Sequence, residues 1–146
     1  MTPDVNVLIA AFRADHAHHV AARTWLDETR RNCSAGRTSL MLLPVAVAGF
    51  LRLVTNARVF VQPDAIDAAV AFVDALLKTP GVSWPVQANA NAWPLLRGKL
   101  LARTLGGNLV TDAWIAASVE AHGEHLVTFD RDFMGLLAVR DLTLLA

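Results

Sequence analysis

The stretch Leu126-Val127-Thr128-Phe129-Asp130-Arg131-Asp132-Phe133 is the most informative segment of this chain. Its β-branched and aromatic residues predict a short buried strand over residues 125–129. Aspartate favours turns, so an ordinary strand end would also explain Asp130. In an open parallel α/β sheet, however, ligands bind just beyond the carboxyl ends of the strands. Asp130, with Asp132 two residues later, therefore stands where such a fold places its working groups.

Size and composition favour one globular unit. The chain has 146 residues, which fits a single domain over 1–146, and 54% of them are hydrophobic, enough for a sizeable core. Because 13 basic residues balance 13 acidic ones, any nucleic acid must bind a local basic patch. The single cysteine, Cys33, excludes an internal disulfide and a cysteine-based zinc site. With neither a secretory signal nor an apolar run near the roughly 20 residues of a membrane span, we expect a cytoplasmic protein.

Helical and strand patterns alternate along the rest of the chain, which is typical of a parallel sheet covered on both faces. Strands are expected just before Asp4 and over residues 39–43, 82–86, 125–129 and 141–145. Helices are expected over residues 7–12, 15–30, 45–55, 65–78, 90–104 and 112–122. Asp15, Asn89 and Thr111 are the expected helix caps.

Three aspartates far apart in sequence stand at comparable places. Asp4, Asp112 and Asp130 each lie where a strand ends or a helix begins. Parallel strands would bring these positions to one edge of the sheet, where the carboxylates repel each other unless a cation neutralises them. Hard divalent ions such as Mg²⁺ prefer these oxygen ligands and can activate water against a phosphate ester. Asn6 and Thr111 add neutral oxygens that would orient the carboxylates or bound waters.

Each acid also has an ordinary structural explanation. Asp112 at a helix start is favoured by the helix dipole, and Asp4 would also suit a terminal surface group. Asp132 would pair on the surface with Arg131 or Arg140. The remaining acids considered fall on polar helix faces or near helix ends, where we expect them to be solvated: Asp27, Glu28, Asp64, Asp67, Asp74, Glu120 and Glu124.

Four segments together resemble a known family. They are Asp-Val-Asn-Val-Leu-Ile-Ala-Ala (4–11), Gly-Phe-Leu-Arg-Leu-Val-Thr-Asn-Ala-Arg-Val-Phe (49–60), Asn-Leu-Val-Thr-Asp-Ala-Trp-Ile-Ala-Ala (108–117) and the opening stretch at 126–133. In this order they resemble PIN-domain ribonucleases, and more narrowly the VapC toxins of bacterial VapBC toxin–antitoxin pairs. The resemblance implies a three-layer α/β/α sandwich around a small, mainly parallel sheet. It also implies a homodimeric endoribonuclease, dependent on Mg²⁺ or Mn²⁺, whose site a cognate VapB antitoxin blocks.

The resemblance assigns catalysis and metal binding to Asp4, Asp112 and Asp130. Asp132 matches a further metal-binding aspartate whose role varies in the family. One departure is Gly49, in Ala-Gly-Phe-Leu-Arg at 48–52, because many PIN nucleases carry a glutamate there. A missing ligand predicts weaker metal affinity. The alternative is therefore a catalytically weakened PIN module that binds RNA or antitoxin without efficient cleavage.

A phosphatase with Asp4 as nucleophile is a third reading of the first acid. Such enzymes usually place a second Asp two residues on as acid/base, and this chain has Asn6 there. This makes the phosphatase the weakest of the three readings.

Several cationic and aromatic residues are candidates for RNA contact. Arg52 and Arg58 flank the end of one helix, and a second set of Arg97, Lys99 and Arg103 lines another. Either set would contact phosphates, although ordinary surface charge explains the second set equally well. Trp93 and Trp114 would stack on bases, but for Trp114 core packing is the preferred interpretation.

Two other patterns carry less specific predictions. His16, His18 and His19 could suggest metal ligands, but surface histidines at a helix start are the preferred interpretation. The apolar helix over 45–54 and the apolar face of 66–77 would offer a surface for a dimer partner or for an amphipathic antitoxin segment.

Overall fold

The fold places a small parallel sheet between two groups of helices. The computed structural model describes residues 1–86 and 92–146. Strand β4 (Leu126–Thr128) lies between β1 (Thr2–Pro3) and β5 (Leu142–Leu144), and both neighbours run parallel to it. A second parallel pair joins β2 (Leu40–Met41) to β3 (Val82–Ser83). The amide of Met41 donates a 2.8 Å hydrogen bond to the Met1 carbonyl, which links this pair to the three-stranded sheet.

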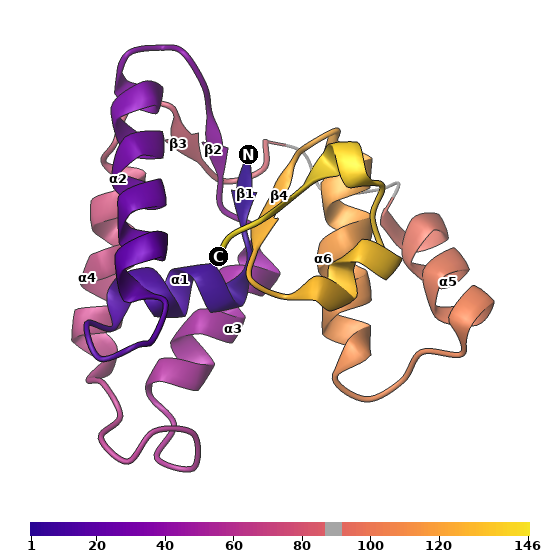
Figure 1. Cartoon of the computed structure of the whole chain (residues 1–146), viewed down its shortest axis with the longest axis horizontal. Helices are drawn as coiled ribbons and strands as arrows, with labels where there is room; N and C mark the ends of the chain where they lie inside the picture. Colours follow the sequence, from indigo (N-terminus) through magenta and orange to yellow (C-terminus); the bar gives the residue numbers. More distant parts are fainter. Residues whose placement is uncertain (87–91) are drawn as a thin grey trace.

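Helices cover the strands on both sides, which gives three layers (Figure 1). On one side lie α1 (Val5–Phe12), α2 (His19–Ser34), α3 (Pro44–Val54) and α4 (Ile66–Leu77). On the other side α5 (Ala92–Arg103) packs against α6 (Leu109–His122). Two short 3-10 helices, η1 (Arg131–Gly135) and η2 (Val139–Asp141), follow β4. The expected α/β/α arrangement is therefore confirmed.

The core explains why the strands hold their positions although they are short. Leu8, Leu40 and Leu126, from α1 and from two strands, are fully buried in the main hydrophobic cluster. Phe50 from α3 meets Phe12 edge-on, with ring centroids 5.4 Å apart. Packing of the helices onto the strands, more than the strand ladders, therefore supplies most of the apolar burial.

Two expected helix caps are wrong. Helix α2 begins at His19 rather than after Asp15, because Asp15 accepts two hydrogen bonds from the Arg13 guanidinium instead. Helix α6 begins at Leu109, so Thr111 lies in its first turn and is not its cap. The third expected cap, Asn89, lies outside the described residues.

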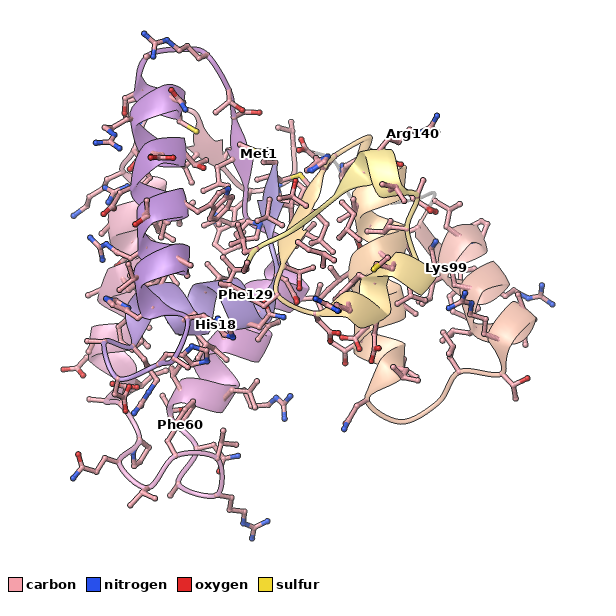
Figure 2. The ribbon with its side chains drawn as sticks, viewed as in Figure 1. Met1, His18, Phe60, Lys99, Phe129 and Arg140 are labelled. Carbon is pink, nitrogen blue, oxygen red and sulfur yellow. The ribbon has the colours of Figure 1, made fainter. Side chains whose placement is uncertain are left out.

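Three acids that we expected to be solvated have specific long-range partners instead. Asp64 binds Arg13, Glu124 binds the Met1 ammonium group at 2.7 Å, and Glu120 binds Lys99 at 2.8 Å. The reason is tertiary, since each cation comes from another segment that the fold brings alongside. Figure 2 shows the labelled Lys99 side chain among the helices on the α5 side.

The expected burial of Trp114 is also wrong. The residue is half exposed, while its neighbours Ala113 and Ile115 are fully buried. The faces of α6 that carry small alanines pack closely against the rest of the protein, and the indole of Trp114 lies on the remaining face, at the surface. No helix in the described part of the chain is long and apolar enough to cross a membrane.

Candidate active site

A pocket of about 390 Å³ lies where β1 and β4 end and α6 begins. It brings together all three aspartates that the sequence places at strand and helix ends. Asn6 and Thr111, the expected supporting residues, and Arg52, an expected RNA contact, also line it. Among the described residues, the lining consists of Asp4, Val5, Asn6, Ile9, Gly49, Arg52, Leu53, Asn108, Thr111, Asp112 and Asp130.

Asp4 is the most enclosed of the acids, with 5% of its surface exposed. It caps α1, and its Oδ1 accepts a 2.6 Å hydrogen bond from the amide of Val5. Its Oδ2 accepts a 2.7 Å hydrogen bond from the hydroxyl of Thr128. Both carboxylate oxygens are therefore held in place, while each keeps a lone pair for a further contact.

Thr128 connects the acids and is the residue that sequence reasoning missed. Its fully buried hydroxyl donates to Asp4 and accepts from the Asp130 amide and from the Asn6 side-chain amide, both at 3.0 Å. The Asn6 carbonyl oxygen in turn accepts from the Phe129 amide at 3.2 Å. A threonine two residues before Asp130, at the end of a buried strand, was the available signal.

Burial and neighbouring carboxylates raise the pKa of two of the acids, Asp4 and Asp112. Burial raises the pKa of Asp4 from 3.8 to about 6; hydrogen bonds from Thr128 and Val5 oppose this, and the charges of Asp112 and Asp130 add to it. Burial also raises the pKa of Asp112, with Asp130 and Asp132 contributing. Asp112 and Asp130 therefore lie close enough to Asp4 for their charges to disfavour its ionised form. A cation in the pocket would favour their ionised forms.

Asp132 lies beside the pocket and does not line it. Its side chain is exposed, and its amide donates to Asp130 Oδ1 at 2.8 Å, which fixes the Asp130 carboxylate at the start of η1. The position of Asp132 places its charge near Asp112. Its assignment as a direct metal ligand stays a prediction.

The donor chemistry of the pocket fits a hard divalent cation. Carboxylates with amide and hydroxyl oxygens beside them are the ligands of Mg²⁺ and Mn²⁺. Within residues 1–86 and 92–146, however, no group of three His, Cys, Asp or Glu side chains stands ready to coordinate one ion directly. Mg²⁺ usually keeps several waters and takes one or two carboxylates, so this spacing suits a partly hydrated ion.

Gly49 lines the pocket on α3, and the resemblance matches this position to a glutamate of many PIN nucleases. A Cβ built there would lie 2.9 Å from Val5 Cγ2, closer than normal packing permits. Val5 therefore occupies the space through which a longer side chain would enter. The glycine is matched to its neighbour, and adding a carboxylate would require Val5 to move.

The expected basic residues separate into different environments. Arg52 is exposed and lines the acidic pocket from the last turn of α3, whereas Arg58 does not line it. Lys99 is already paired, since it binds Glu120 and also donates to the Leu136 carbonyl at 2.5 Å. The Arg103 guanidinium lies against Gly135. Arg52 is thus the cation best placed beside the acids.

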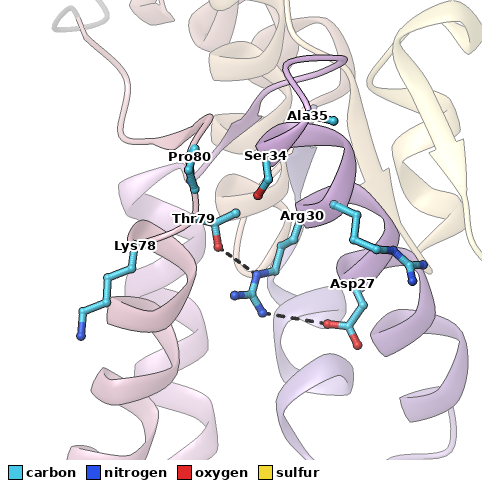
Figure 3. Close-up of a pocket in the computed structure, with 8 residues that line it drawn as sticks. Asp27, Arg30, Ser34, Ala35, Lys78, Thr79 and Pro80 are labelled. Atoms are coloured by element: carbon cyan, nitrogen blue, oxygen red, sulfur yellow. Dashed lines mark hydrogen bonds and ion pairs between the residues drawn. The ribbon is translucent and has the colours of Figure 1, made fainter.

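A larger hollow of about 860 Å³ lies between the ends of α2 and α4 (Figure 3). Two of its cations, Arg31 in the last turn of α2 and Lys78 at the C-cap of α4, stand where positive charge complements the helix dipole. Arg30 is already engaged by Thr79 at 3.0 Å and by Asp27 at 4.0 Å. These contacts make it a structural surface rather than the candidate active site.

The sequence matches the PIN domain family over residues 1–136. The chain belongs to this family. Its PIN domain is 34% identical to Ribonuclease VapC31 and to Ribonuclease VapC25 of Mycobacterium tuberculosis H37Rv, each over 139 residues, covering 95% of this chain and 94% of the relative. The matched region includes all four aspartates, and the resemblance drawn from the motifs is confirmed.

Solved structures show the same fold at low sequence identity. VapBC2 from Rickettsia felis, bound to a DNA fragment from its promoter, aligns with a TM-score of 0.66 and 17% identity, covering 99% of this PIN domain and 98% of that chain. VapC20 of Mycobacterium tuberculosis, a sarcin–ricin loop cleaving toxin, aligns with a TM-score of 0.57 and 21% identity, covering 92% of each. At these identities the likeness supports the PIN fold alone.

Proposed function

We propose that this PIN domain is a divalent-metal-dependent endoribonuclease, the toxin of a toxin–antitoxin pair. One observation carries the proposal: Asp4, Asp112 and Asp130, from three separate elements, line one pocket, where Asp112 and Asp130 add to the raised pKa of Asp4. The relatives named ribonucleases support RNA as the substrate. Asp4, Asp112 and Asp130 would hold Mg²⁺ or Mn²⁺, with Asp132 acting from the rim.

The residues of the pocket have distinct tasks in this proposal. A bound ion would supply a polarised phosphate oxygen and a more acidic water. Asp4 must be ionised to act, and Thr128 holds its carboxylate by a hydrogen bond that favours the charged form. Arg52, exposed at the rim, would attract an RNA phosphate without reading the base.

Cleavage of a structured RNA by purified protein, followed on a denaturing gel, tests the proposal. We expect cleavage with Mg²⁺ or Mn²⁺, its loss in EDTA, and its loss in Asp112→Asn. The matched control is Asp74→Asn, which removes an exposed carboxylate from α4 and should cleave like the parent. Undiminished cleavage in EDTA would refute the metal-dependent mechanism.

A protein antitoxin, a homodimer and a cytoplasmic site of action complete the proposal. They rest on the family and on the VapBC structural neighbour. If the gene lies beside a small reading frame for a DNA-binding protein, co-purification of that protein with this chain should suppress cleavage. Light scattering should give twice the monomer mass of 15.8 kDa. A monomer of full activity would exclude the dimer requirement.

Gly49 favours a second candidate function, a PIN module that binds RNA or antitoxin without efficient cleavage. The observation is that α3 offers no carboxylate there and Val5 fills the approach. Activity of the parent protein discriminates between the candidates. A parent that cleaves with turnover excludes the binding module, whereas an inactive parent that gains cleavage in the double variant Gly49→Glu with Val5→Ala would establish it.

A further inference from the structure

The loop between α1 and α2 carries an aromatic stack that the proposed chemistry does not use. The imidazole of His18 lies on the ring of Phe129, with centroids 4.5 Å apart and planes inclined by 21°. His18 is exposed, and Phe129 is partly buried against the main core. Figure 2 shows the two labelled side chains next to each other, where this loop meets the end of β4. One face of the imidazole thus packs against the Phe129 ring.

Several hydrogen bonds hold the loop that presents His18. Arg13, itself buried, donates two hydrogen bonds of 3.0 and 2.7 Å to the Asp15 carboxylate. The amide of His18 donates to Nδ1 of His16 at 3.1 Å. Nδ1 of His19 lies 2.8 Å from the Ala10 carbonyl. In the described part of the chain, these histidines do not form a group of three side chains that could hold a metal ion.

The stack is connected directly to the candidate active site. Phe129 immediately precedes Asp130, and consecutive Cα atoms are about 3.8 Å apart. The amide of Phe129 donates to Asn6, whose side chain lines the acidic pocket. Phe129 and Asp130 directly follow the last residue of β4, so an RNA strand that passes over the end of β4 would reach both. The pocket and the stack are then neighbouring subsites along one strand of RNA.

We propose that His18, supported by Phe129, is a stacking platform for an unpaired nucleobase next to the phosphate bound among the aspartates. Proteins that bind single-stranded RNA stack splayed bases on aromatic and histidine side chains. The platform selects for an unpaired nucleotide at one position without reading its identity. This inference rests on the proposed ribonuclease function and adds a residue that determines substrate specificity.

The test uses short RNAs with 2-aminopurine placed at each position in turn, bound to full-length Asp112→Asn so that no cleavage occurs. Stacking quenches the fluorescence of this base, which reports the contact independently of activity. We expect strong quenching at one position beside the cleavage site of the parent. His18→Ala should remove that quenching and weaken binding by about tenfold, within the range for loss of one stacking side chain.

Two further variants separate stacking from folding. His18→Phe keeps an aromatic ring on Phe129 and should retain both quenching and affinity. His122→Ala removes an imidazole from the last turn of α6, at the opposite end of the helix from Asp112, and should leave both unchanged. Thermal denaturation of each variant establishes that the fold is intact.

The outcomes distinguish this inference from the proposed function. If the parent cleaves RNA but His18→Ala shows the same 2-aminopurine quenching and RNA affinity as His122→Ala, the platform is refuted and the proposed ribonuclease function is retained. If His18→Phe loses as much as His18→Ala, stacking is refuted as the cause. If the parent neither binds nor cleaves RNA, both proposals fail together.

Discussion

Thr128 and Asp4 are 124 positions apart, yet the hydroxyl of Thr128 donates a 2.7 Å hydrogen bond to the Asp4 carboxylate. The bond ties the end of β4 to the end of β1 at the point where both strands meet the pocket. The same hydroxyl also accepts from the Asp130 amide. One side chain thus sets the relative positions of two of the three acids.

Thr128→Val should shift the pH dependence of cleavage. The Thr128 hydrogen bond lowers the pKa of Asp4, so its loss raises that pKa further above about 6. Since the ionised form of Asp4 is needed, the acidic limb of the pH–rate profile should move to higher pH. Thr128→Ser keeps the hydroxyl and should preserve the parent profile. Coincident profiles for the Val and Ser variants would contradict this role.

Asp4→Asn should stabilise the metal-free protein above pH 6. The folded-state pKa of Asp4, about 6, exceeds the ordinary 3.8, so the folded protein binds this proton more tightly. Stability from this group is therefore fully present below about pH 4 and is lost as pH rises through 6. The difference corresponds to about 3 kcal/mol, which the variant should recover at pH 8 but not at pH 4. Urea denaturation at both pH values measures this difference in the free energy of unfolding. Asp74→Asn is the control and should differ from the parent by the same amount at pH 4 and pH 8.

Gly49→Ala should fail to stabilise α3, although glycine inside a helix usually costs up to about 1 kcal/mol relative to alanine. The new Cβ would meet Val5 Cγ2 at 2.9 Å. Gly98→Ala in α5 is the matched control, since a Cβ there meets nothing within 4 Å. A double-mutant cycle with Val5→Ala should show a coupling energy of about 1 kcal/mol or more. Equal gains from Gly49→Ala and Gly98→Ala would disprove the clash.

Arg13→Gln should be among the most destabilising single changes outside the hydrophobic core. The guanidinium is buried, binds Asp15 and Asp64, and lies 4.0 Å above the Phe60 ring. Removing one partner of a buried pair costs about 3–5 kcal/mol; the exposure of Asp15 places the expected loss near the lower end.

Arg23→Gln provides the comparison for Arg13. It breaks an exposed pair with Asp27 on one helix and should cost no more than about 0.5 kcal/mol. Chemical denaturation of both variants at pH 7 gives the two values. A loss below 1 kcal/mol for Arg13→Gln would show that the cluster around Phe60 contributes little.

Arg52→Ala should weaken RNA binding and lower its salt dependence. A phosphate contact releases about one counterion, so the slope of log affinity against log salt should fall by about 0.7 for single-stranded RNA. Lys99→Met is the contrasting variant, because Lys99 is occupied by Glu120 and should change stability instead of the slope. Equal slopes of log affinity against log salt for Arg52→Ala and the parent would show that Arg52 does not contact an RNA phosphate.

The sequence predicted the parts of this site that depend on strand ends. Asp130 and Asp4 each follow a short buried strand, and parallel pairing of those strands brings the two residues to the same edge. Asp112 reached the same pocket because α6 starts there. The family motifs added the order of elements, which explains why the layers and the PIN fold were predictable.

The errors concern contacts between distant segments. Periodicity placed Trp114 among buried neighbours, but it cannot say which face of α6 the rest of the fold covers. Lys99 and Glu120 looked like separate surface charges because only the packing of α5 on α6 brings them together. Thr128 looked like an ordinary strand residue because its importance lies in a partner 124 positions away.

The brevity of β1 has a consequence for protein engineering. Only residues 2 and 3 form this strand. The amide of Thr2 donates a hydrogen bond to the His125 carbonyl, and the amide of Asp4 donates one to the Val127 carbonyl. A slip of one residue would turn every side chain of the strand to the opposite face, and the Asp4 carboxylate would leave the pocket. A tag or fusion at Met1 that shifts the pairing of β1 would therefore displace the Asp4 carboxylate before it unfolds the domain. A carboxy-terminal tag is the safer choice.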